Sequence, residues 1–220
     1  MSRLSTEAQA SITDSIDPQV DQQARERWGC EFLAGVDEVG RGPWAGPVTA
    51  AAVIFDPERV PMGLRDSKKL TARQRSSLAQ EIEAVAVSFA VIHVPPAEID
   101  RINVLQATFT AMMQALSALE PAAQAVLVDG RQLPPSLNLP AQAIVGGDDQ
   151  SHSIAAASIL AKVARDTHMV ALSQQYPGYG WDTNVGYGTA QHQKGLETYG
   201  VTPHHRRSFK PIHNILWPQK

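Results

Sequence analysis

Hydrophobic and polar positions divide the chain into short apolar runs and longer segments with helical spacing. Five apolar runs have the length of a single β-strand. They occupy residues 30–37, 47–55, 87–94, 125–129 and 141–145. Apolar residues spaced three and four positions apart predict helices, at residues 71–86, 103–120, 153–172 and 189–200. This order of strands and helices predicts a layered α/β or α+β domain with a mixed sheet.

Residues 1–24 show little periodicity. They contain one basic residue and four acids, and a polar segment of this kind buries too little apolar surface to fold by itself. We expect a flexible lead, or a loosely docked helix, with order beginning near Trp28. Residues 25–220 then form one domain, which is helical from about residue 176 to its end.

Composition excludes several classes of protein. Hydrophobic residues make up 43% and charged residues 19% of the 220 residues, as in ordinary globular proteins. The single cysteine, Cys30, excludes an internal disulfide framework and a multi-cysteine zinc site. The apolar stretches are too short to cross a bilayer, and the first residues lack the apolar core of a signal peptide. We therefore expect a cytoplasmic protein without membrane contact.

The net charge of −3 is unevenly distributed along the chain. Residues 1–24 account for all of it, whereas residues 194–220 contain five basic residues and one acid. This balance argues against non-specific coating of nucleic acid, but the basic end allows a local surface for phosphate. Two adjacent histidines there, His204 and His205, lack the spacing of a zinc site and are expected at the surface.

Acidic residues stand at the ends of three predicted strands. In the stretch AGVDEVGRGPWAGPV, the apolar run ends in Asp37 and Glu38. The run at 125–129 ends in Asp129, beside Gly130, and the run at 141–145 is followed by two glycines and Asp148. Sites in layered α/β sheets form in the crevice at the strand ends. If the strands that carry Asp37 and Asp129 are neighbours, the four carboxylates converge.

A cluster of four carboxylates needs cations between its members. Two like charges about 4 Å apart repel by roughly 4 kcal/mol when the effective dielectric constant is about 20. Without cations, such acids are strained or partly protonated. Hard oxygen ligands without histidine or cysteine indicate Mg²⁺ or Mn²⁺. A paired-metal site of this kind promotes in-line displacement at phosphorus.

Each of these motifs also has a simpler explanation. An isolated Asp-Gly at a strand end is usually a turn, which applies to Asp129 and Asp148 taken separately. The neighbouring Asp149 could cap the following helix, so the fourth acid is either Asp148 or Asp149. The glycines of residues 40–42 could form only a tight turn, although they would also let main-chain groups approach a ligand.

Six motifs, taken in order, resemble those of the bacterial ribonuclease HII family, the type 2 ribonucleases H. They are GVDEVGRGPWAGPV, LRDSKKL, VDG, GDDQSHSIAAASILAKVARD, GYGT and HRRSF. The resemblance implies a ribonuclease H-like α/β fold, with a mixed five-stranded sheet flanked by helices and a helical C-terminal part. It also implies an endoribonuclease that cleaves RNA in RNA–DNA hybrids and on the 5′ side of ribonucleotides embedded in duplex DNA. The products would carry 3′-hydroxyl and 5′-phosphate ends.

The resemblance also implies a set of site residues. Asp37, Glu38, Asp129 and Asp148 would be the catalytic acids and would bind two divalent cations, Mg²⁺ or Mn²⁺. The partner would be an RNA–DNA hybrid or a ribonucleotide-containing DNA duplex, bound by a monomer. The chain departs from the family pattern at Gly146 and before GYGT, where lysine is common. These departures weaken phosphate binding rather than the chemistry.

Substrate contacts are expected from three parts of the chain. The resemblance implies that the turn of Gly40, Arg41 and Gly42 contacts the ribose and that Tyr187 of GYGT stacks at the junction. Basic residues of DSKKL and HRRSF are candidates for phosphate contacts, as is one polar helix face, which could also be merely solvated. These candidates are Lys68, Lys69, Lys162, Arg165, Arg206 and Arg207.

Two other functions stay open from the residues. A nuclease of the same superfold could act on DNA without needing a 2′-hydroxyl. Cleavage of an all-DNA duplex would distinguish such a nuclease from a ribonuclease. A non-catalytic hybrid-binding protein could use the acids only as turn residues. It would bind without any effect of metal and would not cleave.

Overall fold

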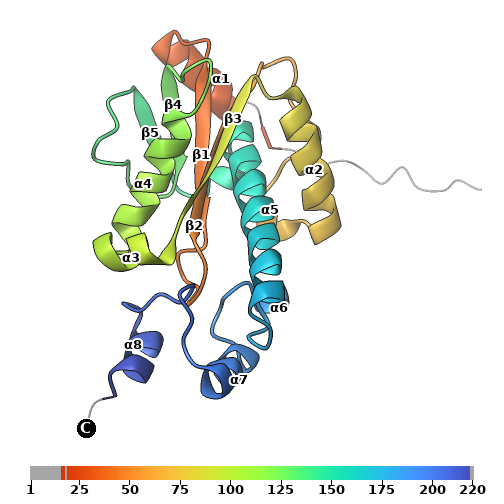
Figure 1. Ribbon diagram of the computed structural model, residues 1–220. Coiled ribbons are helices and arrows are strands. Elements are labelled where there is room, and N and C mark those ends of the chain that lie inside the picture. Colours follow the sequence, from red (N-terminus) through yellow and green to blue (C-terminus); the bar gives the residue numbers. More distant parts are fainter. Residues whose placement is uncertain (1–15, 18, 219–220) are drawn as a thin grey trace, which may run out of the picture.

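The computed structural model describes residues 16–17 and 19–218, and one five-stranded sheet lies at its centre (Figure 1). The strands are β1 (Leu33–Val39), β2 (Val48–Ile54), β3 (Ser88–Val94), β4 (Ala125–Asp129) and β5 (Ala141–Ile144). Their order in the sheet is β3-β2-β1-β4-β5. β2 is antiparallel to β1 and β3, whereas β4 is parallel to β1 and β5. The expected mixed five-stranded sheet is confirmed.

Helices surround this sheet. They are α1 (Gln19–Trp28), α2 (Ala72–Val85), α3 (Pro96–Ile102), α4 (Val104–Ser117), α5 (His152–Gln175), α6 (Trp181–Asn184), α7 (Ala190–Tyr199) and α8 (Lys210–Leu216). Thr71 and Gln74 form a capping box at the start of α2, as their spacing predicts. α3 was not predicted, because it is short and its proline-rich start resembles a loop. In the described part of the chain, every helix is too short or too polar to span a bilayer.

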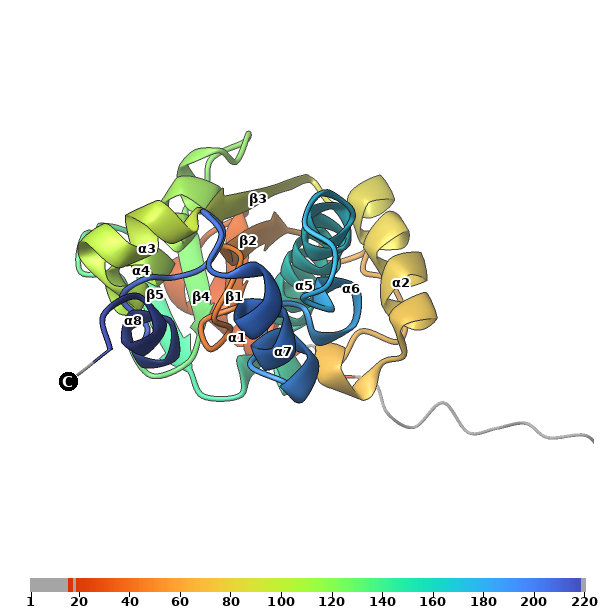
Figure 2. The same cartoon turned by 60° about the horizontal axis from the view of Figure 1, so that its bottom comes forward.

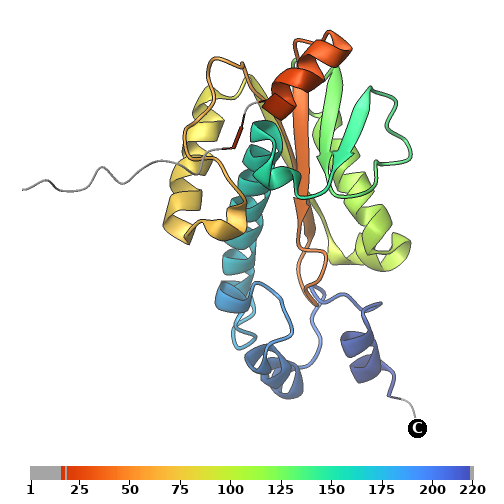
Figure 3. The ribbon, with the colours of Figure 1, turned by 180° about the vertical axis from the view of Figure 1, so that it is seen from behind.

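The helices form a layer on each face of the sheet. α3 and α4 lie on one face, and α2 and α5 on the other (Figures 1 and 3). Alternation along β2 explains the two cores. Ala50 and Ala52 pack with residues of α4, whereas Ala51 and Val53 pack with residues of α2 and α5. The start of α5 lies so close to β1 that a Cβ on Gly35 would come within 2.1 Å of the Ser153 carbonyl carbon.

The C-terminal part consists of α6, α7 and α8 at one end of the sheet, brought forward in Figure 2. Its core contains Tyr179, Trp181 and Leu196, packed with Met169 of α5. The Trp44 N–H donates to the Gly186 carbonyl at 2.8 Å, which ties this part to the turn between β1 and β2. The helical C-terminal part is therefore confirmed, and it lies against that turn.

α1 begins at Gln19 and Ala24 is buried, so order starts earlier in the chain than the expected position near Trp28. The Asp21 carboxylate accepts hydrogen bonds from the main-chain N–H groups of His152 and Ser153, so it caps the start of α5. A cap between residues so far apart in the chain leaves no trace in local periodicity. The expectation of a flexible lead otherwise concerns residues 1–15 and 18, which lie outside the described residues.

Candidate active site

Two of the predicted acids leave the sheet on neighbouring strands. β1 and β4 run parallel with Val36 opposite Val128, so Asp37 and Asp129 follow side by side at the strand ends. Asp37 is buried, with 5% of its surface exposed. Because successive strand residues point to opposite faces, Glu38 projects toward the α4 side while Asp37 projects toward α5. Neighbouring parallel strands therefore bring together the acids that the sequence places far apart.

The Asp37 carboxylate is held by groups from its own strand and from α5. It accepts the Glu38 N–H at 2.6 Å and a hydrogen bond from the Ser158 side chain. The Ser158 hydroxyl in turn lies 3.0 Å from that of Ser67. Burial raises the pKa of Asp37 well above its ordinary value, and the negative charges of Glu38 and Asp129 raise it further. A cation bound beside Asp37 would offset this repulsion and stabilise its ionised carboxylate.

Asp148 lies in a short 3₁₀ turn, Gly147–Asp149, that follows β5. The Gly147 N–H donates to Asp129 at 2.7 Å, which links this turn to the end of β4. Asp148 is buried, and its pKa is raised to about 6 by burial first and then by Asp66 and Asp129. The turn therefore directs Asp148 toward the other acids.

Asp149, the alternative fourth acid, is paired with a lysine. Its carboxylate forms an ion pair with Lys69 at 2.8 Å and is 43% exposed. Asp148 instead interacts with Asp129 and lies 3.8 Å from the Lys68 ammonium group. This placement favours Asp148 over Asp149 as the fourth member of the site.

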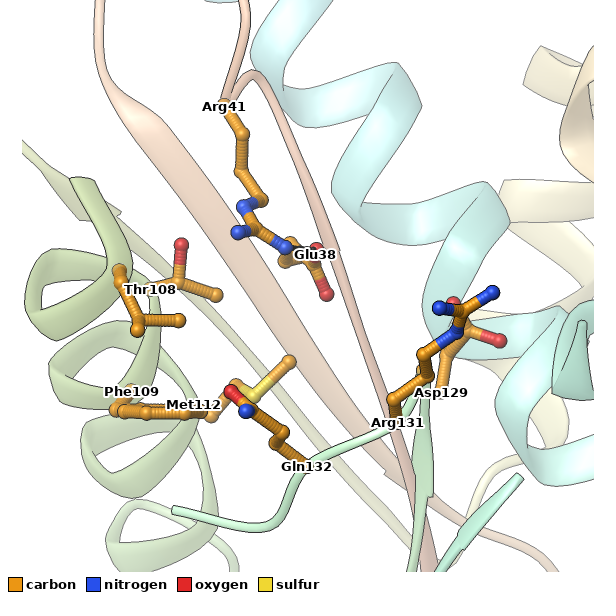
Figure 4. Close-up of a pocket in the computed structure, with 10 residues that line it drawn as sticks. Glu38, Arg41, Thr108, Phe109, Met112, Asp129, Arg131 and Gln132 are labelled. Atoms are coloured by element: carbon orange, nitrogen blue, oxygen red, sulfur yellow. Dashed lines mark hydrogen bonds and ion pairs between the residues drawn. The ribbon is translucent and has the colours of Figure 1, made fainter. Parts of the chain in front are cut away.

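A cavity of about 360 Å³ opens beside Glu38 and Asp129 (Figure 4). Figure 4 shows Arg41 extending toward Glu38, and the two side chains form an ion pair at 3.3 Å. The far wall is formed by α4, with Thr108 and Met112 turned toward the acids. The remaining lining residues are Leu105, Phe109, Gly130, Arg131 and Gln132. The cavity thus has an acidic floor with basic side chains at its edge.

The donor set fits hard divalent cations. Carboxylate oxygens are the ligands that Mg²⁺ and Mn²⁺ prefer. Burial first, and then repulsion by neighbouring acids, raises the pKa values of Asp37, Glu38 and Asp148. A cation would relieve the repulsion. Within the described ranges, no three His, Cys, Asp or Glu side chains are already arranged to coordinate one metal ion. The assignment of divalent cations therefore rests on the chemistry of the carboxylates.

The predicted ribose-contacting turn joins β1 to β2. Gly40 has φ +89° and is buried, and a Cβ there would lie 2.2 Å from Arg165 Nε. Arg41 and Gly42 are exposed. A Cβ on Gly42 would come 3.3 Å from the ring of Tyr187, so the turn and this half-exposed tyrosine face each other. The structure brings together the two elements that were expected to contact the ribonucleotide.

Two predicted phosphate contacts are corrected by the structure. Arg165 and Arg206 are fully buried, and their guanidinium groups donate to main-chain carbonyls. Lys162 is partly buried and forms an ion pair with Asp166 at 2.8 Å. By contrast, the side chains of Lys68 and Arg207 are exposed. Sequence position alone does not distinguish the buried Arg206 from its exposed neighbour Arg207.

The expectation that His205 lies at the surface is also wrong. His205 is 1% exposed, and its Nε2 lies 3.0 Å from Nε2 of the buried His192. Sequence reasoning also missed Asp66, which acts on the pKa of Asp148. Asp66 could have been found from its position in the LRDSKKL motif. His192 could not, because nothing in the local sequence points to its contact with His205, thirteen positions later.

Comparisons with known proteins agree with this site. A family model described as Ribonuclease HII matches residues 34–212. The ribonuclease HII of Ruegeria sp. (strain TM1040) is 56% identical over 198 residues, covering 90% of this chain and 86% of the relative. That of Paracoccus denitrificans (strain Pd 1222) is 56% identical over 195 residues, covering 89% and 92%.

Solved structures show the same fold. The ribonuclease H2 from Pyrococcus horikoshii OT3 superposes with a TM-score of 0.72 at 28% identity, covering 84% of this chain and 97% of that chain. Bst-RNase HIII in complex with Mn²⁺ has a TM-score of 0.69 at 20% identity, covering 88% and 71%, and this likeness concerns the fold alone. From the strand-end acids, the matched motifs and these comparisons together, the chain belongs to the ribonuclease HII family and is an endoribonuclease.

Proposed function

We propose that this endoribonuclease cuts on the 5′ side of a ribonucleotide, both in RNA–DNA hybrids and in duplex DNA with single embedded ribonucleotides. One observation supports this most strongly. The acids at the ends of β1 and β4 lie next to an exposed turn whose Gly42 faces Tyr187. A charged centre for phosphodiester hydrolysis and a surface for a sugar thus adjoin each other.

Asp37, Glu38, Asp129 and Asp148 are the proposed ligands of two divalent cations, Mg²⁺ or Mn²⁺. When bound, such ions lower the pKa of an attacking water and stabilise the leaving 3′-oxygen. The chain holds its own ligands in place beforehand. The Glu38 N–H and Ser158 orient Asp37, and the Gly147 N–H orients Asp129. Fixed ligands reduce the reorganisation needed when the substrate binds.

Ribose recognition is proposed for the turn of residues 40–42 together with Tyr187. The 2′-hydroxyl is the group that distinguishes RNA from DNA, and exposed main-chain groups can hydrogen-bond to it. Gly42 carries no side chain that would keep a sugar away from the backbone. The Tyr187 ring, 48% exposed, offers a flat surface against the same turn.

Phosphate contacts are proposed for Lys68 and Arg207. The Lys68 side chain is 80% exposed, and its ammonium group lies 3.8 Å from Asp148, so it can reach a phosphate beside the acids. Lys162 would join them only by leaving its partner Asp166. A monomeric state and a cytoplasmic location stay predictions.

The test uses a labelled DNA duplex with one ribonucleotide and an all-DNA duplex of the same sequence, each with Mg²⁺, Mn²⁺ or chelator. We expect a metal-dependent nick 5′ of the ribonucleotide in the first duplex only. Asp148→Asn should abolish the nick, whereas Asp149→Asn, which removes an exposed acid, should retain it. Cleavage of both duplexes would show that the enzyme cuts DNA without recognising the ribose. Binding without cleavage in either metal would contradict the catalytic assignment of the acids.

A further inference from the structure

Two buried guanidinium groups hold the turn between β1 and β2. Every side-chain nitrogen of Arg206 donates to a carbonyl of this turn: Nε to Gly46 at 3.0 Å, Nη1 to Arg41 at 2.8 Å, and Nη2 to Gly40. The fully buried Arg206 therefore reaches the main chain on both sides of the predicted ribose contact. These acceptors lie about 160 positions away in sequence.

Arg165 completes the arrangement from α5. Its Nε donates to the Pro47 carbonyl at 3.0 Å and its Nη2 to the Ala45 carbonyl at 3.3 Å. Its Nη1 donates to the Val185 carbonyl at 3.0 Å, two residues before Tyr187. Arg165 thus joins the turn to the segment that carries the tyrosine.

Further main-chain bonds connect the same two segments. The Trp44 and Ala45 N–H groups both donate to the Gly186 carbonyl, at 2.8 and 3.3 Å. The Arg206 N–H donates to the Trp44 carbonyl at 2.8 Å. A Cβ on Gly186 would lie 2.4 Å from the Ala45 carbonyl oxygen, so the segments are in direct contact. A shift of the turn would therefore move Tyr187 as well.

This arrangement is electrostatically unfavourable, so packing alone does not account for it. Burial lowers the pKa values of both arginines, and the charge of Arg165 adds to the effect on Arg206. Two apolar side chains would fill the same space without desolvating two like charges. Apolar side chains would not supply the planar guanidinium group, whose N–H donors have fixed directions and orient several carbonyls at once.

We propose that Arg206 and Arg165 are positioning residues, which set the ribose-contacting turn and Tyr187 at a fixed place relative to the acids at the end of β1. This inference rests on the proposed function of the turn and Tyr187. Neither arginine contacts the substrate in this role. Lysine at either position keeps the positive charge but donates from one rotating point, so it cannot hold three carbonyls.

The test compares Arg206→Lys with Arg101→Lys, which alters an exposed arginine of α3 paired with Glu98. kcat and KM are measured with Mg²⁺ on the single-ribonucleotide duplex at low and high salt. For Arg206→Lys we expect kcat to fall on the order of 10²-fold, as for a displaced reacting centre, with KM changed less than about threefold at either salt concentration. Arg101→Lys should match the wild type.

Hydrogen exchange supplies a readout that does not depend on cleavage. In Arg206→Lys, the hydrogen-bonded amides of Trp44, Ala45 and Gly46 should exchange faster while those of β4 stay protected. A rise in KM that grows with salt, with kcat unchanged, would make Arg206 a phosphate contact and overturn the inference. Unchanged exchange of the Trp44, Ala45 and Gly46 amides would also overturn the inference.

The wild type and the variant answer different questions. If the wild type does not discriminate the ribonucleotide duplex from all-DNA, the proposed function fails, and the exchange result alone decides the positioning role. If Arg206→Lys does not fold, Arg165→Lys takes its place, because it leaves the Arg206 bonds to Gly40 and Arg41 intact. Loss of the folded state in both variants would assign the pair to general stability and overturn the inference.

Discussion

Asp37 and Asp129 leave the sheet at equivalent positions of two parallel strands, one residue beyond the Val36–Val128 pair. Their charges act on each other, since Asp129 raises the pKa of Asp37. The strand pairing itself holds these two acids close together. A site that holds unfavourable charge in a fixed place is built for a ligand of opposite charge.

Removing either charge should end cleavage without unfolding the protein. For Asp37→Asn and Asp129→Asn we expect more than ~100-fold loss of kcat, since even groups behind metal ligands are worth about 10–100-fold. In the Asp37→Asn variant, the side-chain amide oxygen would still accept the Glu38 N–H. Single-turnover cleavage of the ribonucleotide duplex measures the loss, and activity near the wild-type level in either variant would remove that acid from the site.

The Asp37→Asn substitution should also raise stability in chelator. The folded-state pKa of Asp37 lies above its unfolded value, so the folded state binds more protons and loses stability as pH rises through the folded pKa. At pH 7.5, Asp37→Asn should therefore have a higher Tm than the wild type, and the difference should vanish toward pH 4. Calorimetry at both pH values checks this, and a lower Tm at pH 7.5 would contradict it.

Metal affinity should depend on pH through Asp148. Its pKa of about 6 means that, below this pH, a proton must leave before the carboxylate can bind a cation. We expect the Kd for Mn²⁺ to rise up to about tenfold per pH unit below pH 6. Calorimetric titration between pH 5 and 7.5 measures it, with Asp149→Asn as the matched control that keeps the dependence. A Kd constant over this range would refute the prediction.

Gly40 and Gly63 provide a matched pair for the turn. Both have positive φ, +89° and +80°, but a Cβ meets Arg165 and Pro47 at Gly40 and open space at Gly63. Gly40→Ala should lose more free energy of unfolding than Gly63→Ala, by about 1–3 kcal/mol for the extra clash. It should also lower kcat, whereas Gly63→Ala should not. Urea unfolding measures the loss of stability and cleavage assays measure kcat in the two variants. Equal effects of Gly40→Ala and Gly63→Ala would contradict the prediction, because the added methyl group would then be accommodated at Gly40.

Burial lowers the pKa values of His192 and His205, and a chain of hydrogen bonds fixes the tautomer of each neutral ring. His205 Nδ1 accepts the Thr202 N–H at 3.0 Å, so its proton lies on Nε2 and is donated to His192 Nε2 at 3.0 Å. His192 Nε2 also accepts the Trp181 indole N–H, and its Nδ1–H donates to the Tyr187 carbonyl at 2.9 Å. Each ring thus has a defined tautomer.

This pair should weaken the fold in acid. Burial, followed by repulsion from His192 when that ring is protonated, lowers the pKa of His205 to about 3, below its unfolded value. Its contribution is therefore complete above about pH 6.5 and is lost as pH falls below that, by up to about 1.4 kcal/mol per pH unit. His205→Asn should remove this slope and cost about 1–3 kcal/mol at pH 7.5. Unfolding curves from pH 4.5 to 7.5 test it against the exposed His213→Asn, which should keep the wild-type slope.

Much of the fold follows from local pattern. Short continuous apolar runs predicted the five strands, because a central strand is buried on both faces. Helical spacing predicted the long helices, because burial of one face imposes a period. Strand-end acids beside glycines pointed to one charged site, because parallel strands end at the same edge of a sheet. The matched motifs named the same four acids, and family membership followed.

What local pattern could not supply were the partners of side chains that meet across the fold. Arg206 and Arg207 are adjacent in sequence, yet one is buried against the carbonyls of Gly40 and Arg41 and the other is exposed. Asp21 caps a helix that starts 131 positions later. Residue type and spacing determined which elements form and which acids gather. Only the packing of distant segments decided which charges face solvent and which hold the turn, because hydrogen bonds between segments depend on the tertiary arrangement and not on periodicity.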